Sequence, residues 1–148
     1  MPHDFKKFPE LTNQQMDFYY FQSPHRQITE DFRAKVIDVH DGDTIKVRWK
    51  ERNFDFPIRF LYTSAPELDE FRGIEARNWL RDKLMGQEVD IMINQKNRVE
   101  KWGRLLGVIM HKGISMNEEI VREGKALSWE ERNQGKIPTI IELFGGEE

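Results

Sequence analysis

The stretch from Ile58 to Glu67, IRFLYTSAPE, combines the pattern of a β-strand with an abrupt stop. Apolar and aromatic residues recur at every second position from Ile58, which is the period of a strand. Pro66 ends the strand, because proline has no N–H for the ladder and pushes its predecessor into an extended or turn conformation. Arg59 lies on this strand, and Glu67 follows its end. The two side chains either form a plain ion pair or converge on one phosphate.

Length and composition place the chain among globular domains without disulfides. The 148 residues are 33% charged and include no cysteine, which excludes a disulfide framework, a thiolate metal site and a cysteine nucleophile. No apolar run has the length of a bilayer span, and the N-terminus lacks the apolar core of a signal peptide. We therefore expect no membrane partner and a location in the cytoplasm or within a viral particle.

Charge is distributed unevenly, and it divides the chain into three segments. Residues 1–32 carry three Lys/Arg against five Asp/Glu, residues 33–127 carry eighteen against sixteen, and residues 128–148 carry two against five. We interpret these segments as an N-terminal arm, a domain and an acidic C-terminal tail. The mildly basic middle favours a polyanion as partner, because affinity for nucleic acid depends on local phosphate neutralisation.

The arm is predicted to contain a short helix, because Thr12 and Gln15 have the spacing of a capping box. Four consecutive aromatic residues follow, from Phe18 to Phe21, and they cannot all face one side of a helix. Either the arm folds back over its own domain, or it fills a groove on a protein partner. We favour the partner, and expect that deleting residues 1–28 leaves the domain's melting temperature almost unchanged.

The middle segment reads as five strands and two helices. Strands are expected over residues 34–40 and 44–50, around Arg59, and over 87–94 and 105–111. An amphipathic helix is expected over residues 73–85, and a second, short helix with Asn117 as its N-cap follows the fifth strand. This order predicts an α+β, mostly β fold: a five-stranded OB-type Greek-key barrel with two or three helices.

The polar residues of this barrel are the parts of a metal-assisted phosphodiesterase. Asp41 and Asp43 flank a hairpin glycine, and carboxylate oxygens suit hard cations such as Ca²⁺ or Mg²⁺. Arg59 and Arg104 suit a phosphate whose negative charge grows in the transition state. Glu67 is placed to act as a general base on a water molecule.

Four segments in order resemble the thermonuclease (staphylococcal nuclease-like) family, over roughly residues 33–127. They are VHDGDTIKV from Val39, IRFLYTSAPE from Ile58, EKWGRLLGVI from Glu100 and MNEEIVREGKA from Met116. The resemblance implies an OB-type barrel, dependence on Ca²⁺ and cleavage of phosphodiester bonds in DNA and RNA.

The resemblance also implies roles for individual residues. The family's catalytic arginine, glutamate and second arginine match Arg59, Glu67 and Arg104. Its calcium-ligating aspartate matches Asp43, and the residue that offers calcium a backbone carbonyl matches Ala65. Its lysine and tyrosine beside the nucleotide match Lys101 and Trp102.

One departure from the family pattern bears on the metal. Ser64 stands where the family has a second calcium-ligating aspartate, which should weaken calcium binding because affinity follows the number of charged ligands. Asp41 is near enough in sequence to help as a ligand. Two functions follow: a nuclease with an altered metal site, or a weakened module that binds nucleic acid or serves in an assembly such as a phage or viral particle. We favour the nuclease, because Arg59, Glu67 and Arg104 are all present.

Overall fold

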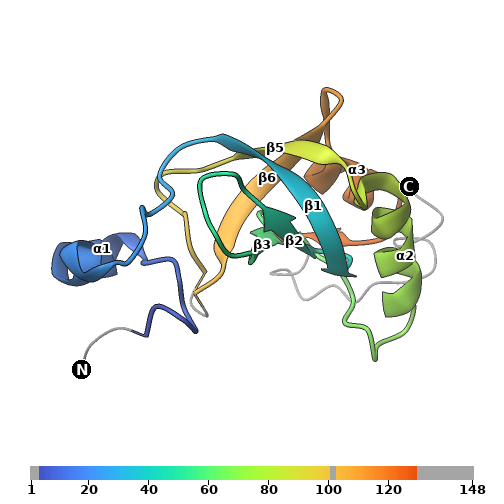
Figure 1. Ribbon diagram of the computed structural model, residues 1–148. Coiled ribbons are helices and arrows are strands. Elements are labelled where there is room, and N and C mark those ends of the chain that lie inside the picture. Colours follow the sequence, from blue (N-terminus) through green and yellow to red (C-terminus); the bar gives the residue numbers. More distant parts are fainter. Residues whose placement is uncertain (1–3, 101–102, 130–148) are drawn as a thin grey trace.

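The protein folds around a closed five-stranded β-barrel. The computed structural model describes residues 4–100 and 103–129 of the 148. The barrel strands are β1 (Phe32–Asp41), β2 (Thr44–Arg48), β3 (Phe56–Phe60), β5 (Glu88–Met92) and β6 (Leu105–His111). Neighbours pair in the order β3-β2-β1-β5-β6, and a parallel pairing of β3 with β6 closes the barrel (Figure 1). This confirms the predicted OB-type architecture.

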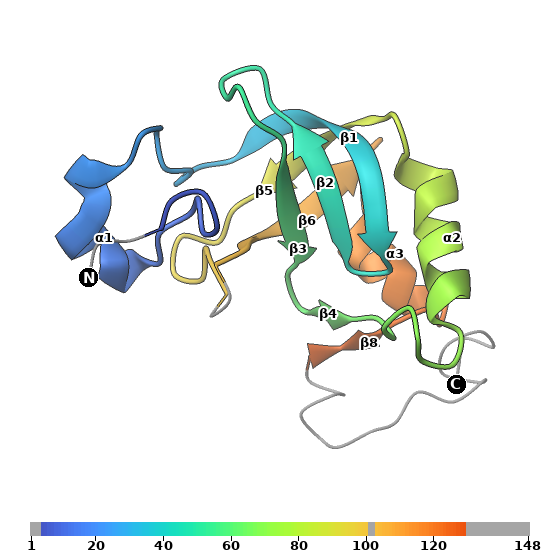
Figure 2. The same cartoon turned by 60° about the horizontal axis from the view of Figure 1, so that its bottom comes forward.

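Helices and short strands surround the barrel. The helical elements are α1 (Asn13–Tyr19), the 3-10 turn η1 (Tyr20–Gln22), α2 (Gly73–Leu84) and α3 (Met116–Arg122). The short strands are β4 (Thr63–Ser64), β7 (Ile114–Ser115) and β8 (Leu127–Ser128). Figure 2 shows α2 standing beside β1, and β4 paired with β8 at one end of the barrel. Over residues 4–100 and 103–129, no helix is both long and apolar enough to span a bilayer.

The alternation of apolar and charged residues explains why these segments form the barrel. In β2, Ile45 and Val47 are fully buried, whereas Lys46 and Arg48 are exposed, as the two-residue period requires. On α2, Leu80 and its neighbours of helical spacing are turned toward the barrel. The largest fully buried side chains lie almost entirely on these elements and include Phe56, Phe60, Ile58, Leu84, Ile91, Leu105 and Ile109.

Two local expectations were wrong. The strand that carries Arg59 ends at Phe60, and Tyr62 adopts a left-handed conformation with φ +69° and is exposed. The chain therefore turns before β4 instead of continuing as one strand. Asn117 does not cap α3, because Ser115 is the N-cap. The Asn117 side chain is instead buried, where its amide donates to the carbonyls of Leu61 and Gly107 and fastens α3 to the barrel.

The arm packs against its own barrel. Leu11 and Ile28 are buried, and the Glu10 carboxylate lies between the guanidinium groups of Arg52 and Arg98. Arg98 also donates to the carbonyls of Leu11 and Ile28, so one buried barrel-side arginine holds two points of the arm. The arm therefore folds back over its own domain, the first of the two alternatives, whereas the effect of deleting residues 1–28 stays a prediction.

The capping box, the aromatic cluster and the tail were also predicted from the sequence. The predicted capping box is confirmed, because Thr12 and Gln15 exchange side-chain and backbone hydrogen bonds at the start of α1. The aromatic residues Phe18, Tyr20 and Phe21 remain exposed, so the arm is attached through other residues. Of the acidic tail, residues 130–148 lie outside the described residues, and a protein partner for the arm stays a prediction.

Removing the Glu10 carboxylate should destabilise the protein strongly. Glu10→Ala leaves two buried arginines without their carboxylate, and breaking a buried ion pair from one side costs about 3–5 kcal/mol. Glu30→Ala is the control, because its ion pair with Arg26 is exposed and such pairs contribute about 0–1 kcal/mol. Urea unfolding of both variants measures the difference, and equal losses would show that the arm contributes no stability through Glu10.

Candidate active site

The turn between β1 and β2 places two buried carboxylates side by side. The Asp43 N–H donates to Oδ1 of Asp41 over 3.0 Å, and the two residues are 7% and 5% exposed. Gly42 lies between them in close contact with the rest of the site. A Cβ at this position would lie 2.6 Å from Cβ of Ala65 and 3.0 Å from Cβ of Ala76. Glycine is therefore required for the turn to approach the loop after β4 and helix α2.

The Asp43 carboxylate joins three separate parts of the chain. Its Oδ2 accepts a hydrogen bond from the Ala65 N–H at 2.9 Å and lies 3.2 Å from Nη2 of Arg59. Its Oδ1 accepts a hydrogen bond from the Thr44 hydroxyl at 3.2 Å. The β1–β2 turn, strand β3 and the loop that begins at Ala65 consequently meet at one carboxylate.

Arg59 is held in place from both sides. Its Nη1 donates to the carbonyls of Phe60 and Thr63, each over 2.9 Å, and its side chain is only 15% exposed. The turn after β3 therefore wraps around the guanidinium group. Because β3 ends at Phe60 and the chain then turns, the Thr63 carbonyl lies close enough to accept a hydrogen bond from Arg59. A strand that continued past Phe60 would not make this contact.

Arg104 approaches the same turn from the start of β6. Glu100 holds its guanidinium group with two hydrogen bonds of 2.6 and 3.1 Å, and Nη1 lies 3.3 Å from the Thr44 hydroxyl. The Glu100 carboxylate raises the pKa of Arg104 further above its ordinary value. Arg59 and Arg104 thus contact adjacent residues of one turn, Asp43 and Thr44.

Ionisation of the Asp43 carboxylate is costly at this position. Burial, together with the hydrogen bond and charge of Asp41, raises the pKa of Asp43 to about 7, although Arg59 opposes the shift. A bound cation would relieve this cost, and paired carboxylates are the ligands that a hard cation such as Ca²⁺ prefers. Residues 4–100 and 103–129 hold no cluster of three acidic or histidine side chains suited to a metal. The donor set fits a cation that takes further ligands from backbone carbonyls and water.

The other residues singled out from the sequence have varied positions. Glu67 is exposed on the loop two residues after Ala65, where its N–H donates to the Glu70 carboxylate over 2.6 Å. In the described part of the chain, its own carboxylate forms no ion pair or hydrogen bond with Arg59 or Arg104. Ser64 is half-buried on β4, next to Ala65. Lys101 and Trp102 lie outside the described residues.

Sequence reasoning missed two residues of this arrangement. Thr44 bridges Asp43 and Arg104 through its hydroxyl, and Glu100 fixes Arg104. No local rule predicts the pairing of Glu100 with Arg104, because opposite charges four residues apart meet regularly on helices, and Arg104 directly precedes strand β6. The role of Thr44 has no signal either, because a threonine at the start of a strand is ordinary.

Comparisons with known proteins show the family to which the chain belongs. The family described as "Staphylococcal nuclease homologue" matches residues 57–144, and the chain belongs to this staphylococcal nuclease family. The resemblance drawn from the four sequence segments is confirmed. Membership of a nuclease family implies nucleic acid as the class of substrate.

Similar proteins include several that are named as nucleases. A "Micrococcal nuclease" of Shigella flexneri is 32% identical over 77% of this chain and 66% of its own length. An "Uncharacterized endonuclease" of Escherichia coli O157:H7 is 28% identical over 76% of this chain and 71% of its own length. Another "Uncharacterized endonuclease", from Haemophilus influenzae, is 25% identical over 70% of this chain and 56% of its own length. The chain thus spans between about half and three quarters of these relatives.

Neutralising Asp43 should stabilise the metal-free protein most in neutral and alkaline solution. Because the pKa of Asp43 is raised from 3.8 to about 7 on folding, the folded state is penalised progressively as the pH rises from about 4, and the penalty is complete above about 7. Asp43→Asn keeps an acceptor for the Ala65 N–H and should raise the melting temperature in EDTA by a few degrees near about pH 8.5, and less near about pH 5.5. Asp38→Asn, on an exposed position of β1, is the control. Equal effects at both pH values would contradict the assignment.

Proposed function

We propose that this chain is a metal-dependent nuclease that hydrolyses phosphodiester bonds of DNA or RNA. The observation that carries the proposal is the convergence of Arg59 and Arg104 on one turn that also holds the buried Asp41–Asp43 pair. Cleavage of a phosphodiester needs positive groups around the phosphate and a base for the attacking water. Arg59 and Arg104 would supply the positive groups, and Glu67 would supply the base.

The two arginines would bind and orient the phosphate. Each guanidinium is already fixed by neighbouring groups, Arg59 by two carbonyls and Arg104 by Glu100, so little order is lost when a phosphate binds. Arginine donates two parallel hydrogen bonds to phosphate oxygens, and these strengthen as charge develops in the transition state.

Glu67 would accept the proton of the attacking water. It is exposed, so its carboxylate is free to reach a water beside a bound phosphate. Its loop starts at Ala65, whose N–H is tied to the Asp43 carboxylate over 2.9 Å. This hydrogen bond fixes the start of the loop at the buried end of the site. Glu67, two residues further along, stays in solvent.

A divalent cation, which we propose to be Ca²⁺, would be held by the carboxylates of Asp41 and Asp43, helped by Ser64 and the Ala65 carbonyl. When bound, such a cation withdraws charge from a phosphoryl oxygen and so assists attack on phosphorus. Asp43 would exchange part of its pairing with Arg59 for the cation, which leaves Arg59 available for the phosphate.

The second candidate function is a module with weak catalysis that binds nucleic acid or takes part in an assembly such as a phage particle. Ser64 favours it, because the position adjoining Ala65 lacks a carboxylate. In either case we propose residues 33–127 as the nuclease-like domain, with residues 1–32 as an arm attached to it and residues 128–148 as an acidic tail.

Substitution of the base and of the fixed arginine should remove most activity. Glu67→Gln and Arg59→Ala should each lower kcat by ~10²–10⁴-fold on an oligonucleotide substrate, because they remove a base and a phosphate ligand. Arg122→Ala and Glu123→Gln are controls, since both residues are exposed at the end of α3. Rates of the active-site variants equal to those of the controls would refute the roles given to Glu67 and Arg59.

Adding a carboxylate beside Ala65 should strengthen metal binding. Ser64→Asp raises the number of charged ligands, and we expect calcium affinity to increase on the order of tenfold. Ser64→Asn has nearly the same size without the charge and serves as the matched control. Isothermal titration calorimetry of the three proteins measures the change, and equal affinity for the aspartate and asparagine variants would show that position 64 does not face the metal.

A further inference from the structure

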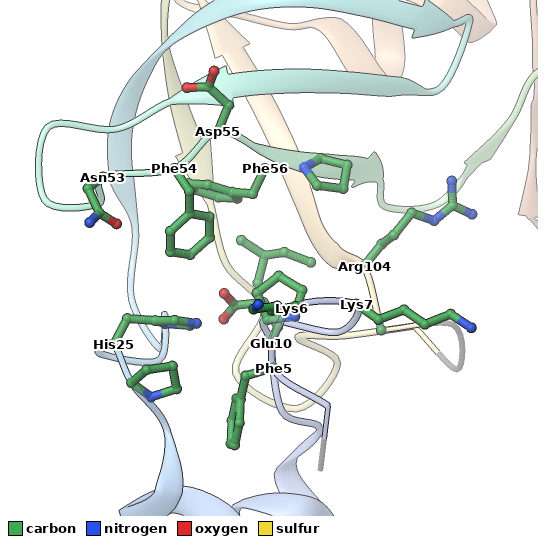
Figure 3. Close-up of a pocket in the computed structure, with 15 residues that line it drawn as sticks. Phe5, Lys6, Lys7, Glu10, His25, Asn53, Phe54, Asp55, Phe56 and Arg104 are labelled. Atoms are coloured by element: carbon green, nitrogen blue, oxygen red, sulfur yellow. The ribbon is translucent and has the colours of Figure 1, made fainter.

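A cavity of about 590 Å³ lies between the arm and the barrel. Its size is within the range of about 300–1,000 Å³ that is typical of small-molecule sites. The arm contributes Phe5, Lys6 and Lys7 on one side and His25 on another, and the barrel contributes residues 53–57, which end the β2–β3 loop and begin β3. Figure 3 shows these side chains surrounding an open space, with Phe54 and Phe5 at opposite ends of it. We call it the arm pocket.

The arm pocket borders the candidate active site. Arg104 belongs to its lining, together with Gly103 and Leu105. The arm packs directly on this segment, because a Cβ at Gly103 would lie 2.5 Å from the ring of Phe8. The segment 103–105 therefore packs against the arm and also carries Arg104, whose guanidinium group contacts Thr44 next to the β1–β2 turn. The arm side of the pocket lies outside residues 57–144, which the family matches.

The charge that remains available in the arm pocket is positive. Glu10 is compensated by two buried arginines, and Asp55 is paired with Arg48 through two hydrogen bonds of 3.0 Å. Among the described residues, no carboxylate pairs with the side chains of Lys6 or Lys7, and both residues are exposed. In Figure 3, Lys7 and Arg104 extend toward the same side of the pocket. This side therefore suits phosphate groups.

The inner wall of the arm pocket is aromatic and offers a hydrogen-bond acceptor. The His25 ring centroid lies 5.0 Å from that of Phe54 and 6.5 Å from that of Phe5. Burial lowers the pKa of His25, so the ring is neutral at pH 7. Its Nδ1 lies 3.2 Å from the Arg26 carbonyl and takes the proton, which leaves Nε2 as an acceptor. Nε2 is buried without a hydrogen-bond partner among the described residues.

We propose that the arm pocket is a nucleotide subsite, which takes one unpaired base of a single-stranded nucleic acid beside the phosphate held at the active site. The base packs against the aromatic wall, and the adjoining phosphates contact Lys6 and Lys7. Single strands are the matching substrate, because a base enters such a pocket only when it is unstacked and unpaired. This inference rests on the proposed function and extends it, since the arm becomes part of the substrate-binding surface.

The first test measures binding of a fluorescent single-stranded octanucleotide to the full chain in EDTA, so that metal-assisted hydrolysis does not interfere. The double variant Lys6→Ala/Lys7→Ala should bind more weakly. The slope of the logarithm of its association constant against the logarithm of the salt concentration should become smaller in magnitude by about 1.4, because each phosphate contact on a single strand contributes about 0.7. Lys35→Ala/Lys83→Ala removes the same charge from β1 and α2 and should leave the slope unchanged. Equal slopes for both double variants would overturn the phosphate contacts.

The second test concerns the base. Phe5→Leu keeps an apolar side chain while removing the aromatic face, and it should weaken binding by at least about 5-fold, the effect of losing one stacked base. Phe18→Leu, an exposed aromatic of the same arm outside the pocket, is the control. On an oligonucleotide with abasic sites throughout, wild type and Phe5→Leu should bind alike. If Phe5→Leu lost the same affinity for both oligonucleotides, or lost none, the subsite would be overturned.

The two tests also separate this inference from the proposed nuclease activity. Binding in EDTA that depends on Lys6, Lys7 and Phe5, in a protein that cleaves no substrate with any divalent metal, would support the subsite and refute the nuclease. Cleavage that depends on Arg59 and Glu67, with pocket variants indistinguishable from their controls, would support the nuclease and overturn the subsite.

Discussion

The contact on which the site depends is the one between the Asp43 carboxylate, the Ala65 N–H and Arg59. It joins the β1–β2 turn, strand β3 and the loop that carries Glu67, and it does so at a buried position where an ionised carboxylate is costly. One arginine compensates that charge only in part, because Asp41 lies beside it and the pKa of Asp43 stays raised to about 7. The Asp41–Asp43 pair therefore carries negative charge that a divalent cation would compensate further. Arg59 would then be available to bind a phosphate.

A second buried charge ties the arm to the barrel in a comparable way. Glu10 comes from the arm, whereas its partners Arg52 and Arg98 come from the barrel, and each arginine is almost fully buried. Such pairs stabilise a fold mainly by the penalty for breaking them. The arm is thereby fixed next to the segment that carries Arg104, while Phe18, Tyr20 and Phe21 stay exposed on the arm.

The sequence predicted the barrel and most of its elements because strands with alternating residues, such as Thr44–Arg48, and the amphipathic helix α2 follow local rules. The convergence of Asp43 with Arg59 was also within reach, since both positions belonged to motifs of one family. What the sequence did not show were the contacts between distant segments that no family motif covers. The attachment of the arm depends on which arginines are buried, and the pairing of Glu10 with Arg52 has no local pattern. The bridging role of Thr44 and the buried amide of Asn117 likewise appear only when the strands are assembled.

The most direct measurement is cleavage of an end-labelled single-stranded oligonucleotide by the unmodified chain in Ca²⁺, Mg²⁺, Mn²⁺ or EDTA, with DNA and RNA substrates in parallel. The account predicts hydrolysis with a divalent cation, with Ca²⁺ as the expected one, and none in EDTA. At a limiting concentration of the cation, activity should increase as the pH rises toward about 7 and level off above it, because Asp43 must lose its proton to hold the cation. Binding of the oligonucleotide without cleavage under any of these metals would contradict the account and favour a module that only binds nucleic acid.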